Sequence, residues 1–199
     1  MDYFNYKNGT LFAENIDVHE IARQVGTPAY IYSKATILEH YNKIKNAYSG
    51  LDTTICYSVK ACSNIHILKI LAQAGSGFDI VSGGELYRVL QASGDPSKVV
   101  YAGVGKTDKE INESLQAGIG YFNIESQAEL ENLIKLASAS GKRPKAALRV
   151  NPDVDPKTHT YITTGKKESK FGVDIERAQR VFAQYGKNDA VDLCAIHVH

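Results

Sequence analysis

The stretch from Gly77 to Val104, GFDIVSGGELYRVLQASGDPSKVVYAGV, contains one complete unit of the pattern that decides the fold. A short apolar run, GFDIVS, is followed by an amphipathic helical pattern, GELYRVLQASG, and then by a second apolar run, VVYAGV. Two strands joined by a helix in this way form a βαβ unit, in which the strands lie parallel. The stretch therefore predicts a parallel sheet with helices packed on it.

The same unit recurs on both sides of this stretch. Apolar runs with strand character begin at Thr54, Gly77, Val99, Tyr121, Lys145 and Asp192, and the first five starts are 23, 22, 22 and 24 residues apart. The helical patterns HILKILAQAG, GELYRVLQASG, KEINESLQAG and QAELENLIKLASASG lie between them, and each closes on glycine. Such even spacing, without a GxGxxG after the first strand, favours a (β/α)8 TIM-type barrel over a doubly wound sheet. Six strands are visible, so we predict an α/β barrel truncated after about six strands.

The two ends of the chain differ in kind from this repeat. Residues 1–33 predict a hairpin or strand pair, a short helix, and a Gly26-Thr27-Pro28 turn into another strand, and we assign them to a second β-domain. Residues 34–199 form the partial barrel in this interpretation. His199 falls within an apolar strand pattern with no turn after it, so we expect the chain to be cut short.

Composition excludes several classes of partner. The chain is 43% hydrophobic, and its 23 basic and 22 acidic residues give a net charge of +1, so neither nucleic acid nor an anionic membrane is predicted to bind. No apolar run approaches the ~20 residues of a membrane span, and the first residues lack a signal peptide. Three cysteines show no metal-type spacing and suit a reducing compartment, which predicts a cytoplasmic protein.

Charged residues stand at the ends of several predicted strands. Lys60 closes the apolar run of ICYSVKACSN (55–64), Asp79 lies within GFDIVS, Arg149 ends AALR, and His199 ends the last run. The carboxyl ends of barrel strands meet at one face, where such enzymes build their sites. A lysine there could attack a carbonyl cofactor, although most strand-end lysines are solvated surface residues. Asp79 is expensive to bury without a partner, and we expect Lys60 to provide one.

Two further motifs have competing interpretations. The run GVGKT (103–107) resembles the end of a phosphate-binding loop, but the first glycine of that loop should stand at Val100, so we predict an ordinary βα turn. His197 and His199 lie on the same face of a predicted strand. They could share a metal ion, form a packed or hydrogen-bonded pair, or stack against a flat cofactor.

Five segments together carry a family resemblance: CYSVKACSN, GFDIVSGGEL, FNIESQAEL, LRVNPDVDPKTHTYITTGKKESKFGV and IHVH. From about Thr27 to His199 the chain resembles the diaminopimelate decarboxylases, of the alanine-racemase-like fold type III of pyridoxal-phosphate enzymes. The HTYITTG run before Lys170-Phe171-Gly172 distinguishes it from ornithine decarboxylase, and ACSN after Lys60 differs from alanine racemase. Arginine and carboxynorspermidine decarboxylases remain alternatives, as does a non-catalytic cofactor-binding relative.

The resemblance implies a cofactor, pyridoxal 5'-phosphate, and roles for particular residues. Lys60 would bond to the cofactor aldehyde, with Asp79 and Ser58 close to it. Arg149 would hydrogen-bond near the ring and His199 would stack on its face, which makes Lys60 and His199 the catalytic candidates. His197 matches the first histidine of the family's HxHIGS run, and no metal is implied.

The resemblance also implies an activity. The reaction is that of a carboxy-lyase, which converts meso-2,6-diaminopimelate to L-lysine and CO2 in a homodimer with active sites at the interface. Members of the family have longer chains, which carry a glycine-rich phosphate loop and a β-domain with substrate ligands. No counterpart of these parts is present in the 199 residues, so we expect this chain alone to be inactive.

Overall fold

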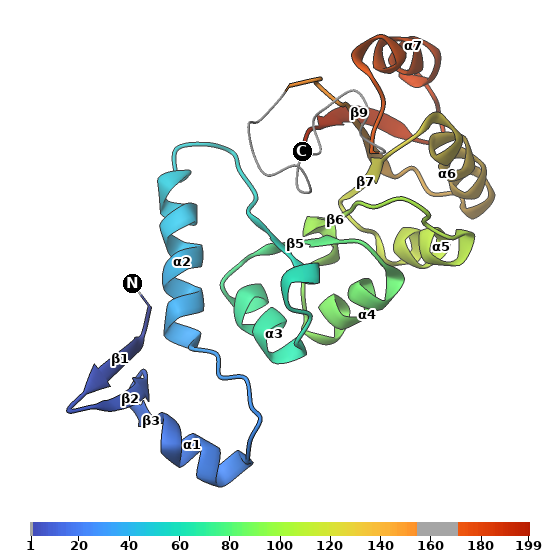
Figure 1. The fold of residues 1–199 in the computed structure, drawn as a ribbon. Coiled ribbons are helices and arrows are strands. Elements are labelled where there is room, and N and C mark those ends of the chain that lie inside the picture. Colours follow the sequence, from blue (N-terminus) through green and yellow to red (C-terminus); the bar gives the residue numbers. More distant parts are fainter. Residues whose placement is uncertain (1, 155–170) are drawn as a thin grey trace.

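The structure is a computed structural model that describes residues 2–154 and 171–199. Its N-terminal part is a small antiparallel sheet of β1 (Phe4–Lys7), β2 (Thr10–Ala13) and β3 (Ile16–Asp17), followed by α1 (Val18–Val25). This sheet shares no strand with the larger one and lies at the opposite end of the molecule from α5 and α6 (Figure 1). The strand predicted after the Thr27-Pro28 turn is wrong, because residues 29–33 pair with no strand in the described part of the chain.

The larger sheet has six parallel strands in sequence order. After α2 (Lys34–Ala47), these strands alternate with helices, as predicted, and all six predicted strands are present. The elements are β4 (Cys56–Ser58), η1 (Val59–Ala61), α3 (Ile65–Gln73), β5 (Gly77–Ile80), α4 (Gly83–Gln91), η2 (Pro96–Lys98), β6 (Val99–Tyr101), α5 (Asp108–Ala117), β7 (Tyr121–Ile124), α6 (Gln127–Ser140), β8 (Lys145–Arg149), α7 (Ile175–Tyr185) and β9 (Asp192–His197). The predicted barrel-type α/β architecture is confirmed, and in the described residues its strands form an open six-stranded sheet.

Three helices begin with the same local device. Ser82, Thr107 and Ser126 are the N-caps of α4, α5 and α6, and each side-chain oxygen accepts a hydrogen bond from the backbone N–H of a glutamate three residues later. In α5 the Glu110 carboxylate also accepts from the Thr107 backbone N–H, which completes a capping box; in α4 and α6 the glutamate accepts instead from the backbone N–H of the residue before the N-cap. At the other end, Gly118 and Gly141 take the left-handed conformation that closes α5 and α6.

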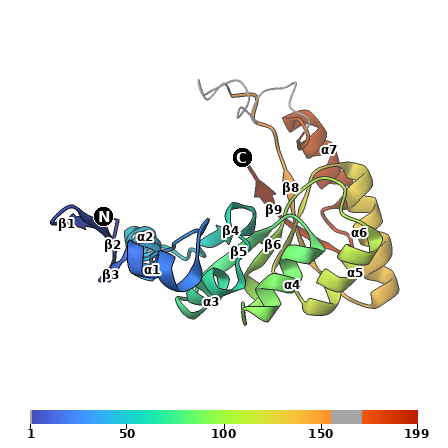
Figure 2. The ribbon, with the colours of Figure 1, turned by 60° about the horizontal axis from the view of Figure 1, so that its bottom comes forward.

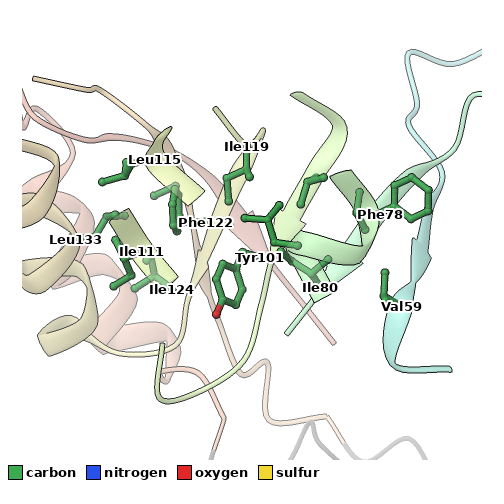
Figure 3. Packing of buried hydrophobic residues seen from close by; sticks show 14 of the residues in the cluster. Val59, Phe78, Ile80, Tyr101, Ile111, Leu115, Ile119, Phe122, Ile124 and Leu133 are labelled. Carbon is green, nitrogen blue, oxygen red and sulfur yellow. The ribbon is translucent and has the colours of Figure 1, made fainter. Parts of the chain in front are cut away.

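The core lies between one face of the large sheet and its helices. Figure 2 shows α4, α5 and α6 along one side of the sheet. The strand side chains that face these helices are almost fully buried, with the rings of Tyr101 and Phe122 stacked 6.3 Å apart between centroids. Figure 3 shows this packing, which includes Phe78, Ile80, Tyr101, Phe122 and Ile124.

Side chains alternate along a strand, so the residues between these core positions point to the other face. That face carries Ser58, Asp79, Asn123, Arg149 and His197, and we call it the polar face. A bulge between Ala146 and Ala147 of β8, opposite Cys194 of β9, keeps this alternation in step. In the described residues, no helix is both long and apolar enough to cross a membrane.

Candidate functional site

The carboxyl edge of the sheet brings most of the predicted site residues together. Ser58 is the last residue of β4, Arg149 the last of β8, and His197 the last of β9. Ser58 pairs in register with Asp79, and Arg149 pairs in register with His197. Because parallel strands end at the same edge, these four side chains share one end of the polar face.

Asp79 has a partner, but not the one expected from the sequence. The Ser58 hydroxyl donates a hydrogen bond to Oδ2 of Asp79 over 3.1 Å. Lys60 lies in the 3-10 turn η1, two residues beyond the end of β4, and its side chain is exposed. Within the described ranges no ion pair joins Lys60 to Asp79, so that expected pairing is wrong, because η1 turns the chain off the strand before Lys60.

Arg149 forms a buried ion pair with a residue that sequence reasoning missed. Nη1 of Arg149 donates to Oε1 of Glu125 over 2.9 Å, and the two side chains are 10% and 2% exposed. Glu125 directly follows β7, whose last residue Ile124 pairs with Leu148, so Glu125 lies next to Arg149. The signal was present in FNIES, an apolar strand that ends in a carboxylate.

The segment Phe171-Gly172-Val173 packs on Arg149. The Phe171 ring centroid lies 4.9 Å from the guanidinium carbon. The backbone N–H of Val173 donates to the Arg149 carbonyl over 2.9 Å, and Gly172 has a φ of 75° that brings its backbone against the same residue. The other motif residues, HTYITTG (159–165) and Lys170, lie outside the described residues.

The two histidines occupy different positions. His197 is half-buried, and burial, followed by the nearby Arg149 charge, holds the pKa of its imidazole below the usual value. His199 is exposed and lies two residues beyond β9, so the two imidazoles do not share a strand as the sequence pattern predicted. In the part of the chain that the structure describes, no cluster of three or more His, Cys, Asp or Glu side chains could hold a metal ion.

The ammonium group of Lys106, in the GVGKT run, makes all three of its hydrogen bonds within the protein. Its Nζ is buried and donates to Glu129 Oε1 over 2.6 Å, to the Gly103 carbonyl over 2.7 Å and to the Asn123 carbonyl over 2.8 Å. An ammonium has three protons, and each has an acceptor here. This lysine therefore secures the turns after β6 and β7, and the predicted βα turn is confirmed in place of a phosphate loop.

Two buried polar atoms at this edge have no hydrogen-bond partner among the described residues: Oε2 of Glu125 and Nδ1 of His197. Buried polar atoms normally have a hydrogen-bond partner, from the protein, a water molecule or a ligand. Both of these atoms lie beside Arg149 on the polar face. Lys60 adds a primary amine at the same edge. An amine with buried polar groups on a face that the helices leave uncovered fits a polar carbonyl cofactor such as pyridoxal phosphate.

Comparisons with known proteins agree with this fit. The family model described as "Pyridoxal-dependent decarboxylase, pyridoxal binding domain" matches residues 34–199. The chain is 48% identical over 200 residues to the diaminopimelate decarboxylase of Vibrio cholerae, covering 100% of this chain and 48% of that protein.

Two solved structures superpose closely on the chain. The diaminopimelate decarboxylase of M. jannaschii has a TM-score of 0.92 at 35% identity, covering 100% of this chain and 48% of that one. The Helicobacter pylori enzyme complexed with L-lysine has a TM-score of 0.88 at 38% identity, covering 91% and 46%. The chain thus spans about half the length of the relatives it matches.

Proposed function

The chain belongs to the pyridoxal-dependent decarboxylases, and we propose that the full-length protein converts meso-2,6-diaminopimelate to L-lysine and CO2. The observation that carries the proposal is the 48% identity to a diaminopimelate decarboxylase over the whole of this chain. The relative solved with L-lysine, the product of this reaction, supports the same substrate class. The proposed substrate, meso-2,6-diaminopimelate, is a small molecule that carries an amino group and a carboxylate at each end.

The cofactor, when bound, supplies an electron sink for the electron pair that the departing carboxylate leaves behind. Lys60 is the residue that would hold its aldehyde, because it supplies a primary amine two residues after Ser58, the last residue of β4 at the carboxyl edge. An exposed amine at this position would be accessible to the cofactor aldehyde. His199 would cover the cofactor ring with its flat imidazole.

The other polar side chains of the site orient their neighbours and neutralise buried charge. The Ser58 hydroxyl donates a hydrogen bond to Asp79 Oδ2, which holds the orientation of the carboxylate. Glu125 compensates the buried charge of Arg149, so that the guanidinium can stay at the edge without a solvent partner. These contacts fix a polar surface before any ligand binds, and preorganisation of this kind is what a catalytic site requires.

The assembly follows the family in this proposal. Residues 1–33, with their separate antiparallel sheet, contribute to a second β-domain, and residues 34–199 form the pyridoxal-binding domain. The full-length protein forms a homodimer in the cytoplasm, with each active site at the interface.

The direct test is product formation by the purified full-length protein. Supplied with pyridoxal phosphate and diaminopimelate, it should release CO2 and L-lysine in equal amounts. Ornithine and arginine serve as competing substrates, because the related decarboxylases act on them. Turnover of ornithine or arginine, with no lysine formed from diaminopimelate, would reject the substrate while leaving the family assignment intact.

A further inference from the structure

Glu125, Arg149 and His197 form one row across three neighbouring strands. Arg149 and His197 pair in register between β8 and β9, and Glu125 follows the paired residues Ile124 and Leu148 of β7 and β8. Residues in register on parallel strands point to the same side of the sheet. The row therefore places a carboxylate, a guanidinium and an imidazole side by side on the polar face.

The two outer members of this row hold unsatisfied atoms. Oε1 of Glu125 is bound to Arg149, but Oε2 has no partner in the described part of the chain, and neither has Nδ1 of His197. Glu125 is 2% exposed, so its second oxygen cannot be satisfied by bulk water. Buried polar atoms without partners are rare and are concentrated where a protein binds a ligand or an ordered water. Neither the proposed anchor Lys60 nor the proposed ring contact His199 accounts for them.

We propose that Glu125 is a positioning residue of the pyridoxal-binding site. It fixes the Arg149 guanidinium and offsets its charge, and it thereby limits the effect of that charge on the neighbouring His197, a hydrogen-bonding group at the same edge. The inference rests on the proposed function only for the identity of the ligand, since the coupling of the three side chains depends on their geometry alone.

Several charges act on His197. Burial disfavours its protonated form most strongly, and the positive charge of Arg149 acts in the same direction, as does His199. The negative charges of Glu125 and Asp79 favour the protonated form. Glu125 and Arg149 thus have opposite effects on one imidazole. When both are charged, each offsets the effect of the other, which is what a compensating pair should do.

Two charge-removing variants separate this role from a merely structural one. Glu125→Gln keeps the shape of the side chain but leaves Arg149 without a counter-charge, so His197 should bind a proton less readily. Arg149→Gln leaves Glu125 unpaired beside the imidazole, so His197 should bind a proton more readily. The double variant removes both charges and should return His197 close to its original behaviour. Glu131→Gln removes an exposed carboxylate on α6 and is the matched control.

The measurement is a pH titration of the imidazole by NMR in the full-length protein, with histidine-specific isotope labels and with His197 assigned from a His197→Gln variant. We expect the midpoint to fall by about one pH unit in Glu125→Gln and to rise by about one in Arg149→Gln. The double variant should lie near the wild type, and Glu131→Gln should leave the midpoint unchanged. Shifts in the same direction, or no shift in either single variant, would overturn the coupling.

Cofactor binding is the second readout. Glu125→Gln should weaken the binding of pyridoxal phosphate at least tenfold, measured by fluorescence, while Glu131→Gln leaves it unchanged. If Arg149→Gln does not fold, Arg149→Lys replaces it: retaining the charge should leave the His197 midpoint nearly unchanged, and a shift as large as that of Glu125→Gln would contradict the proposal. If the His197 midpoints shift as expected but Glu125→Gln binds pyridoxal phosphate like the wild type, the positioning role of Glu125 is refuted while the coupling of the three side chains stands. Failure of the wild type to form lysine, with the coupling intact, would refute the proposed substrate instead.

Discussion

Gly172→Ala tests how tightly the Phe171-Gly172-Val173 segment holds Arg149. Gly172 has a φ of 75°, and a Cβ at this position would lie 2.8 Å from the Arg149 carbonyl oxygen and 2.9 Å from its Cγ. Contacts this short between a carbon and backbone atoms force one partner to move. Since the Val173 N–H binds the same carbonyl, the displacement falls on the residue that pairs with Glu125.

The magnitude has two parts. A left-handed conformation costs a non-glycine residue about 1–2 kcal/mol. Overpacking a tight contact adds about 1–3 kcal/mol, so Gly172→Ala should lower the free energy of unfolding by about 2–5 kcal/mol. Gly141→Ala is the matched control: Gly141 has a φ of 64°, but a Cβ there meets no atom within 4 Å. Gly141→Ala therefore has the backbone cost only, and the difference in the free energy of unfolding between the two variants measures the contact of residue 172 with Arg149.

The assay is urea denaturation of both variants in the full-length protein, followed by titration with pyridoxal phosphate. Gly172→Ala should be less stable than Gly141→Ala by about 1–3 kcal/mol and should bind the cofactor at least tenfold more weakly. Gly141→Ala, at the end of α6, should bind the cofactor like the wild type. Equal losses of stability to within about 0.5 kcal/mol, with equal cofactor affinities, would refute the reasoning that Gly172 serves Arg149.

Three other predictions concern stability, pH and the cofactor. Lys106→Ala leaves the buried carboxylate of Glu129 without its ion-pair partner, so it should lower the free energy of unfolding by about 3–5 kcal/mol, measured by urea denaturation. Lys109→Ala breaks an exposed ion pair and should lower it by less than about 1 kcal/mol. Because the pKa of His197 is lowered in the folded state, the unfolded chain takes up a proton that the folded protein refuses, so stability should fall as the pH drops through about 6.5. That fall should be smaller in His197→Gln, and equal pH profiles would contradict it. His199→Ala should weaken cofactor binding about two- to tenfold in a fluorescence titration if its ring stacks on the cofactor, since ring stacking contributes about 0.5–1.5 kcal/mol.

The repeated strands could be predicted because each combines an apolar run with a capped helix. The N-caps at Ser82, Thr107 and Ser126 and the even spacing of the runs depend on local sequence alone. The strand expected in residues 29–33 failed for the opposite reason, because a strand exists only where a neighbour pairs with it, and the local pattern cannot supply that neighbour.

Among the site residues, strand-end position could be predicted but pairing could not. Arg149 was predicted to stand at a strand end near the cofactor ring, yet only the register of β7 against β8 identifies Glu125 as its partner. Asp79 was assigned to Lys60, although the η1 turn leaves Ser58 as its hydrogen-bond donor. Such choices depend on angles of a few residues after a strand, which sequence periodicity does not encode.

The central claim is that Lys60, at the carboxyl edge of the sheet, carries the cofactor. The most direct measurement is borohydride reduction of the cofactor-loaded full-length protein, followed by proteolysis and mass spectrometry of the pyridoxyl-labelled peptide. We predict that the label lies on Lys60, in the peptide that contains ICYSVKACSN, and that Lys60→Ala carries no stoichiometric label. A stoichiometric label on any other lysine, Lys106 included, would contradict the account.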